Sequence, residues 1–169
     1  MEGEVLASGK KHADNVAPCI FGGFVLIRGY EPVDVTNLVY PETMHCTALH
    51  PAIEIMTIES RKLLPVMVPL EAAVTQWGNV GGLVAGLYKG DFDLISRSMK
   101  DVIVEPVRSV LIQGFDEVKV AAMEAGAVGC SISGSGPTIF ALSKNREESL
   151  VVTNAMRDAY KKVGVPFTI

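Results

Sequence analysis

The stretch from Val128 to Leu142, VGCSISGSGPTIFAL, constrains the fold of this chain more than any other part of the sequence. Apolar residues lead into it, the turn-forming residues Ser-Gly-Ser-Gly-Pro interrupt it, and β-prone residues follow. Alternation along the first part places Val128, Cys130 and Ile132 on one face of a strand. The stretch therefore predicts a β-hairpin with a glycine-rich turn.

The turn of this hairpin has two interpretations. Gly134 and Gly136 permit positive φ angles and leave the neighbouring amides uncovered by side chains, so consecutive N–H groups can form a concave anion site. Alternatively, the turn needs glycine only in order to close. Spacing excludes two better-known phosphate motifs, because the third glycine of a dinucleotide fingerprint would fall on Ile139 and no P-loop sequence occurs.

Composition narrows the class of protein. The chain has 169 residues, of which 49% are hydrophobic and 20% charged, with a net charge of −4. This supports one packed domain or slightly more, and the lack of clustered basic residues argues against nucleic-acid binding. No uncharged run reaches the roughly 18 residues of a membrane helix, so we expect no membrane partner. Cys19, Cys46 and Cys130 are odd in number, widely spaced and in apolar surroundings, which predicts buried free thiols in a reducing cytoplasm.

Local signals predict the remaining elements. Residues 24–27 and 33–40 are expected to pair as strands after a loop over residues 12–23, and residues 44–55 form another strand with a kink at Pro51. The order from residue 44 onward indicates an α+β domain with helices on one face of an antiparallel sheet. Capping, glycine and composition signals predict helices over residues 57–64, 69–89, 91–99, 116–125 and 146–163, and an edge strand over residues 165–169.

Two of these helices carry a pattern that predicts how they pack. Gly78, Gly82 and Gly86 recur every four residues in the helix over residues 69–89, and they predict a smooth surface against a neighbouring element. The helix over residues 146–163 is amphipathic. The residues expected to face inward on it are Leu150, Val151, Ala155, Ala159 and Val163.

Two motifs together resemble a known family. The sequence GSGPT at residues 134–138, followed by an apolar strand, resembles the third motif of the GHMP kinases, named after galactokinase, homoserine kinase, mevalonate kinase and phosphomevalonate kinase. The sequence HADNVAP at residues 12–18, followed by FGGF at residues 21–24, resembles the signature of the homoserine kinase branch. Both motifs in the right order are far more specific than either alone.

The resemblance implies a fold and a division into domains. Residues 43–169 are expected to form the ferredoxin-like GHMP-kinase C-terminal domain, with helices packed on one face of an antiparallel sheet. Residues 1–42 are expected to be the trailing part of the N-terminal domain. The chain corresponds to only about the second half of the family's length, so the ATP loop is expected upstream, and the chain by itself is expected to be inactive.

The resemblance also implies a substrate site. Asn15 is expected to hydrogen-bond the reacting hydroxyl group, and Arg61 and Arg108 are expected to hold the substrate carboxylate. Gly134, Ser135 and Gly136 are expected to support the ATP loop from behind and not to contact ATP directly. No side chain is expected to act as a dedicated base, and no residue of this chain is assigned to a metal.

Without the resemblance, these residues have ordinary interpretations. Asn15 would be a loop or turn residue, and Arg61 and Arg108 would be solvated charges. The three histidines are too scattered for a metal site.

Three functional hypotheses remain open at this point. The first, implied by the resemblance, is the C-terminal portion of a homoserine kinase that uses ATP and Mg²⁺ to phosphorylate L-homoserine for threonine biosynthesis. The second is another GHMP small-molecule kinase with a different hydroxylated substrate. The third is a ligand-binding or dimerisation module without catalysis. A homodimer is a further expectation.

Overall fold

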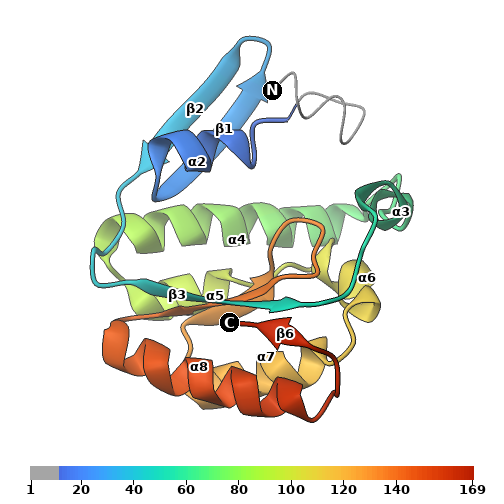
Figure 1. The fold of residues 1–169 in the computed structure, drawn as a ribbon. Coiled ribbons are helices and arrows are strands. Elements are labelled where there is room, and N and C mark those ends of the chain that lie inside the picture. The colour runs from blue at the N-terminus through green and yellow to red at the C-terminus, as the bar shows by residue number, and fades with distance from the viewer. Residues whose placement is uncertain (1–11) are drawn as a thin grey trace.

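The computed structural model describes residues 12–169 and is built around a four-stranded antiparallel sheet (Figure 1). The strand order is β4-β5-β3-β6. Helix α7 lies between β3 and β4 in the chain, and α8 lies between β5 and β6, so the order and topology are those of a ferredoxin-like domain. The predicted α+β fold class is confirmed. The bounds are β3 (His45–Pro51), α7 (Phe115–Glu124), β4 (Gly129–Ile132), β5 (Ile139–Ser143), α8 (Arg146–Lys161) and β6 (Phe167–Thr168).

The predicted glycine-rich hairpin is formed by β4 and β5. The amide of Ser133 donates to the carbonyl of Thr138 over 2.8 Å, which closes the turn. Gly134 and Gly136 have φ angles of +59° and +85°, in the left-handed region that side chains other than glycine rarely enter. The glycines at these two positions are therefore required by the backbone of the turn itself.

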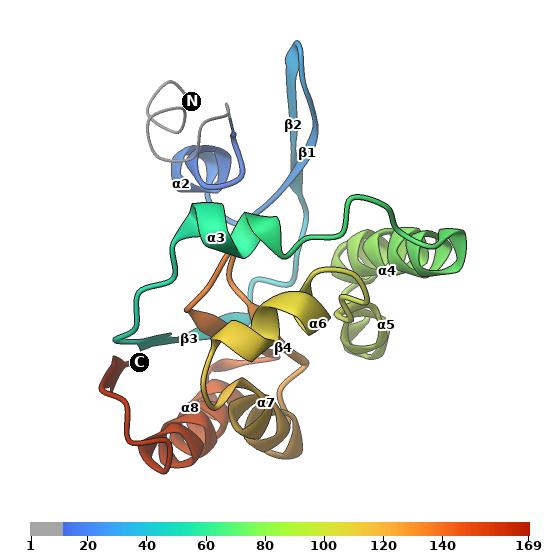
Figure 2. The same cartoon turned by 90° about the vertical axis from the view of Figure 1, so that its right-hand side faces the viewer.

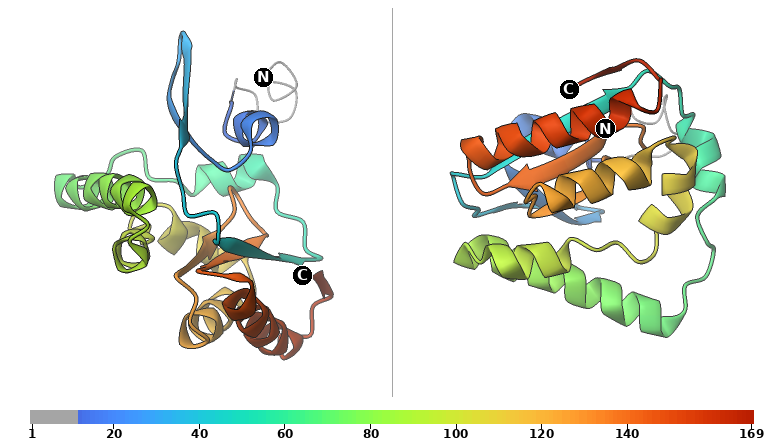
Figure 3. Two further views of the ribbon diagram at one scale, coloured as in Figure 1. Left: turned by 90° about the vertical axis from the view of Figure 1, so that its left-hand side faces the viewer. Right: turned by 90° about the horizontal axis from the view of Figure 1, so that it is seen from below.

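Helices α7 and α8 cover one face of the sheet and enclose the larger core (Figures 1 and 3). On α8 the predicted inward set is wrong in part, because Leu150 and Val151 are 55% and 56% exposed. The helix is rotated so that the larger residues Met156 and Tyr160 are buried, which removes more apolar area from water. The same rotation lets the hydroxyl of Thr47 on β3 hydrogen-bond to α8, and the partner hydroxyls are those of Ser149 and Thr153.

Helices α4 (Leu70–Lys89) and α5 (Phe92–Ser98) pack against the opposite face. Alternation along β5 directs Ile139 and Ala141 to the first core and Phe140 and Leu142 to the second. Val128 packs with Leu142 in the second core, not on the face of Cys130 as predicted, because the strand begins one residue later at Gly129.

The glycine pattern of α4 has the predicted packing at two of its three positions. A Cβ on Gly82 would lie 2.3 Å from the hydroxyl oxygen of Ser98, and one on Gly86 would lie 2.8 Å from Cγ1 of Ile95. Both glycines therefore allow α5 to approach α4 closely. A Cβ on Gly78 would meet nothing within 4 Å, so that position faces open space.

Helix α2 (Val16–Phe21) and the hairpin of β1 (Phe24–Tyr30) and β2 (Val33–Leu38) lie beyond α4, away from the sheet (Figures 1 and 2). The predicted strand pairing is confirmed, but α2 occupies a segment predicted as loop. Pro18 is compatible with that helix because it stands in the first turn, where backbone N–H groups have no helical partner. The domain boundary after residue 42 stays a prediction.

Three short elements complete the fold, namely α3 (Thr57–Lys62), α6 (Glu105–Arg108) and the 3-10 turn η1 (Ser109–Leu111). The sequence predicted α3 but neither α6 nor η1. The predicted end of α4 is confirmed, because Gly90 adopts a left-handed conformation. The predicted start of α5 is also confirmed, because the Asp91 side chain accepts a hydrogen bond from the amide of Leu94 over 2.9 Å. Within residues 12–169, no helix is long and apolar enough to span a membrane.

Candidate functional site

Helix α3 carries Arg61 to the segment that precedes α2. The distance between Nη2 of Arg61 and Nε2 of His12 is 2.6 Å, which is a hydrogen bond. Because a guanidinium group has no acceptor, Nε2 of His12 must be the acceptor and therefore carries no proton in this contact. The bond joins the HADNVAP motif to a helix 49 positions further along the chain.

Helix α6 carries Arg108 to the glycine-rich hairpin. Nη1 of Arg108 donates to the carbonyl oxygen of Gly134 over 2.8 Å. The Nε atom of Arg108 is buried and has no hydrogen-bond partner among the residues that the structure describes. A buried donor without a partner is costly, so this nitrogen favours the binding of an acceptor.

The charges around Arg108 also favour an anion. Burial lowers the pKa of Arg108, and the nearby positive charge of Arg61 lowers it further, while Asp101 raises it. The two arginines are therefore close enough to repel each other in a partly desolvated place, and Asp101 compensates only in part. A bound carboxylate or phosphate would relieve this repulsion.

Asn15 stands directly before α2 with its side chain exposed. It occupies the N-cap position of that helix, but its side chain accepts no capping hydrogen bond. The amide is therefore available to a ligand. The contact between His12 and Arg61 fixes the start of this segment against α3, three residues before Asn15 in the sequence.

The glycine-rich turn is largely occupied by internal hydrogen bonds. The amide of Gly136 donates to the carbonyl of Ser133 over 3.0 Å, and the carbonyl of Gly134 accepts from Arg108. The hydroxyl of Thr138, at the end of the turn, bonds Nδ1 of His50 over 2.7 Å. Through the carbonyl of Gly134, the turn supports Arg108. Figures 2 and 3 show this hairpin rising from the sheet toward the side of the molecule on which α2 and α3 lie.

Comparisons with known proteins show which proteins this chain is similar to. The sequence profile of the family described as "GHMP kinases C terminal" matches residues 83–162. A homoserine kinase of Chlorobium phaeobacteroides (strain BS1) is 52% identical over 160 residues, which are 95% of this chain and 50% of that protein. The crystal structure of homoserine kinase from Cytophaga hutchinsonii is 55% identical with a TM-score of 0.95, and the match covers 99% of this chain and 53% of that chain.

The chain belongs to the GHMP kinase family, in its homoserine kinase branch. The predicted resemblance is thereby confirmed. The crystal structure of L. major mevalonate kinase matches 88% of this chain and 49% of that chain with a TM-score of 0.65 and 12% identity, which shows a shared fold alone. The chain spans about half the length of the homoserine kinases that it matches.

Three residues of this candidate site were missed by the sequence interpretation. Glu105 of α6 accepts a hydrogen bond from the hydroxyl of Ser131 on β4 over 2.6 Å, and it forms an ion pair with Lys119 of α7. The sequence offered one signal for α6, because an acidic residue followed by proline, as in Glu105-Pro106, is typical of a helix start. No sequence signal links Glu105 to Ser131 or Lys119, since only the tertiary fold brings them together.

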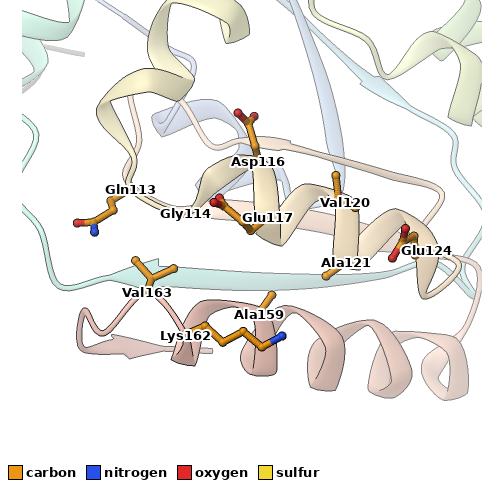
Figure 4. A pocket seen from close by; sticks show the side chains of 10 residues that line it. All are labelled: Gln113, Gly114, Asp116, Glu117, Val120, Ala121, Glu124, Ala159, Lys162 and Val163. Carbon is orange, nitrogen blue, oxygen red and sulfur yellow. The ribbon is translucent and has the colours of Figure 1, made fainter.

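A separate groove of about 700 Å³ lies between α7 and α8 (Figure 4). It contains none of the predicted site residues. Val120, Ala121 and Ala159 contribute apolar surface, and the carboxylates of Asp116 and Glu117 lie along α7. Helices α7 and α8 cover the sheet on the side away from α2 and α3, so this groove is separate from the arginine site (Figure 1).

Proposed function

We propose that this chain is the C-terminal half of an ATP-dependent homoserine kinase, which converts L-homoserine to O-phospho-L-homoserine in threonine biosynthesis. The observation that carries the proposal is the buried, unpartnered Nε of Arg108 beside the glycine-rich hairpin, with the positive charge of Arg61 near enough to lower the pKa of Arg108. An amino-acid substrate brings a carboxylate, and the planar guanidinium group is the side chain best suited to hold one.

In this proposal Asn15 hydrogen-bonds the side-chain hydroxyl of homoserine. Its exposure and its lack of a capping bond support this role. An amide cannot take up a proton, so Asn15 orients the hydroxyl and does not act as a base.

The reaction transfers the γ-phosphoryl group of ATP to homoserine. The hydroxyl oxygen forms a bond to the γ-phosphorus, the bond to the bridging oxygen breaks, and its electron pair leaves with ADP, while the hydroxyl proton passes to solvent or to a phosphate oxygen. Such a transfer depends mainly on positioning and charge neutralisation. The part assigned to this chain is to hold homoserine by both ends, with Gly134, Ser135 and Gly136 as support behind the phosphates.

The proposal includes ATP and Mg²⁺ because the resemblance to GHMP kinases implies them. Among the side chains that the structure describes, no three of the types His, Cys, Asp and Glu are grouped so that they could hold a metal ion. The described residues therefore do not fit a Mg²⁺ site formed by this chain. No step of the proposed reaction is assigned to such an ion. The expected homodimer and the expected cytoplasmic location stay predictions.

The proposal is tested by ADP release from the protein produced with the upstream sequence of its gene. L-Homoserine is compared with L-serine and mevalonate as phosphoryl acceptors. Arg61→Ala and Arg108→Ala are each expected to raise the KM for homoserine about 10- to 100-fold, the size of a lost hydrogen bond to a charged group, with little change in the KM for ATP. Arg146→Ala is the matched control, because Arg146 is exposed at the start of α8.

The outcomes separate the hypotheses. Faster turnover of another acceptor than of homoserine would favour a different small-molecule kinase. Absence of turnover from a folded protein with all acceptors would favour a binding module without catalysis. An equal effect of Arg61→Ala and Arg146→Ala would contradict the carboxylate role of Arg61.

A further inference from the structure

The short helix α6 cannot hold its own position. It has four residues, and its i to i−4 backbone hydrogen bonds run from the amide of Arg108 to the carbonyl of Val104 over 3.1 Å and from the amide of Ser109 to the carbonyl of Glu105. A helix of one turn is not stable in water by itself. Contacts with other elements must therefore determine where α6, and with it Arg108, lies.

Two acidic residues supply most of these contacts. Before the helix, Oδ1 of Asp101 accepts from the amides of Ile103 and Val104, each over 2.8 Å. In its first turn, Oε2 of Glu105 accepts from the hydroxyl of Ser131, and Oε1 pairs with the ammonium group of Lys119. The side chain of Glu105 is only 12% exposed, so its two contacts are largely shielded from water.

Glu105 and Arg108 hold the same hairpin from the same helix. They are three positions apart on α6 and so project from neighbouring points of its surface. Their partners, Ser131 and Gly134, are three positions apart where β4 enters the glycine-rich turn. α6 is thus attached to the hairpin at both of its ends.

We propose that Glu105 is a positioning residue, which holds α6 on β4 through Ser131 and Lys119 and thereby sets Arg108 for the substrate carboxylate. This inference rests on the proposed function, because it needs Arg108 to bind a carboxylate. Glu105 touches no reacting atom in this arrangement. Its effect on the reaction passes through Arg108 alone. Substitution of Glu105 should therefore weaken only the binding of substrates that carry the carboxylate, which a general loss of stability would not do.

The experiment uses the protein with its upstream gene sequence and compares L-homoserine with its methyl ester, in which the carboxylate charge is absent. The variants are Glu105→Gln and Ser131→Ala, each also made together with Arg108→Ala. Glu117→Gln is the control, because Glu117 is an exposed acidic residue of α7. Thermal unfolding of each variant verifies that it is folded at the assay temperature.

Glu105→Gln is expected to raise the KM for homoserine about tenfold, because the charge-assisted contact between Arg108 and the substrate carboxylate is misaligned. The ester lacks this contact, so its kcat/KM is expected to change less than about twofold. Ser131→Ala is expected to have a smaller effect in the same direction. In the presence of Arg108→Ala, both substitutions are expected to add nothing.

The following outcomes would contradict the positioning role of Glu105, the proposed function, or both. Equal losses with homoserine and with the ester, or no loss with either, would overturn the positioning role while homoserine turnover by the unsubstituted protein upholds the proposed function. Losses that add to those of Arg108→Ala would overturn it as well. No turnover of homoserine by the unsubstituted protein would overturn the proposed function and, with it, this inference.

Discussion

At the scale of single residues, the two arginines differ in what holds them. Arg61 contacts a side chain of the HADNVAP motif, whereas Arg108 contacts a main-chain carbonyl. His12 belongs to that motif, but Arg61 lies outside both motifs, so the sequence did not predict their contact. The contact of Arg108 depends on where a carbonyl group points, and almost any residue could supply that group.

Cys130 provides a prediction at this scale. Burial raises the pKa of its thiol from the ordinary 9.0 to about 12. The unfolded thiol therefore loses its proton first as the pH rises, and above pH 9 this favours the unfolded state. Stability from the buried thiol is fully present below pH 9 and is lost as the pH rises toward 12, by up to about 4 kcal/mol in total.

Urea unfolding at several values from about pH 8 to about pH 10.5 measures this effect. Cys130→Ala is expected to be less stable at the lowest pH, and the gap to the unsubstituted chain is expected to narrow as the pH rises. Cys19→Ala is the control, because Cys19 is exposed. The prediction that all three thiols are buried is wrong for Cys19 and Cys46, and only Cys130 is buried. Parallel curves for Cys130→Ala and the unsubstituted chain would contradict the prediction.

At the scale of elements, α4 shows why identical residues in one pattern need not have one role. Gly86 packs against α5, where a Cβ would lie 3.0 Å from the backbone nitrogen of Ile95 and 3.3 Å from the carbonyl oxygen of Asp91. Backbone atoms cannot move aside as the end of a flexible side chain can. Gly78 belongs to the same four-residue repeat but faces open space.

Gly86→Ala and Gly78→Ala therefore form a matched pair with opposite expected signs. Gly86→Ala is expected to destabilise the fold by about 1–3 kcal/mol, because the added methyl group forces α4 and α5 apart. Gly78→Ala is expected to stabilise it by about 0.5–1 kcal/mol, because alanine is the better helix former. Chemical denaturation of both variants measures the two changes, and a shared sign would refute the packing described for Gly86.

At the scale of the whole molecule, the burial of the two sheets differs. No residue of β1 or β2 is buried, whereas three residues of β3 and four of β5 are buried. Local opening requires little free energy where few apolar contacts are broken. The β1–β2 hairpin is therefore expected to open independently of the ferredoxin-like sheet.

Hydrogen exchange of the 169-residue chain, followed by mass spectrometry, tests this expectation. Amides of β1 and β2 are expected to exchange at least about 100-fold faster than those of β5. The result bears on the predicted boundary after residue 42. Equal protection in both sheets would mean that residues 12–42 belong to one cooperative unit with the rest.

The sequence by itself determined the types of the elements other than the short α2, α6 and η1, and it determined the hairpin and the family. These follow from local causes, namely the positive φ angles of Gly134 and Gly136, the capping of α5 by Asp91, and the left-handed end of α4 at Gly90. It also singled out Arg61 and Arg108 through the resemblance to the family. Their roles stay proposals.

Only the tertiary structure decided which surfaces meet. The face that α8 buries depends on competition between two apolar stripes, and the larger side chains of Met156 and Tyr160 are the ones that enter the core. The position of α6 depends on Glu105 meeting Ser131 and Lys119, residues 26 and 14 positions away. Such contacts leave no local pattern in the sequence, because each partner alone is an ordinary polar residue, and only the fold brings them within hydrogen-bonding distance.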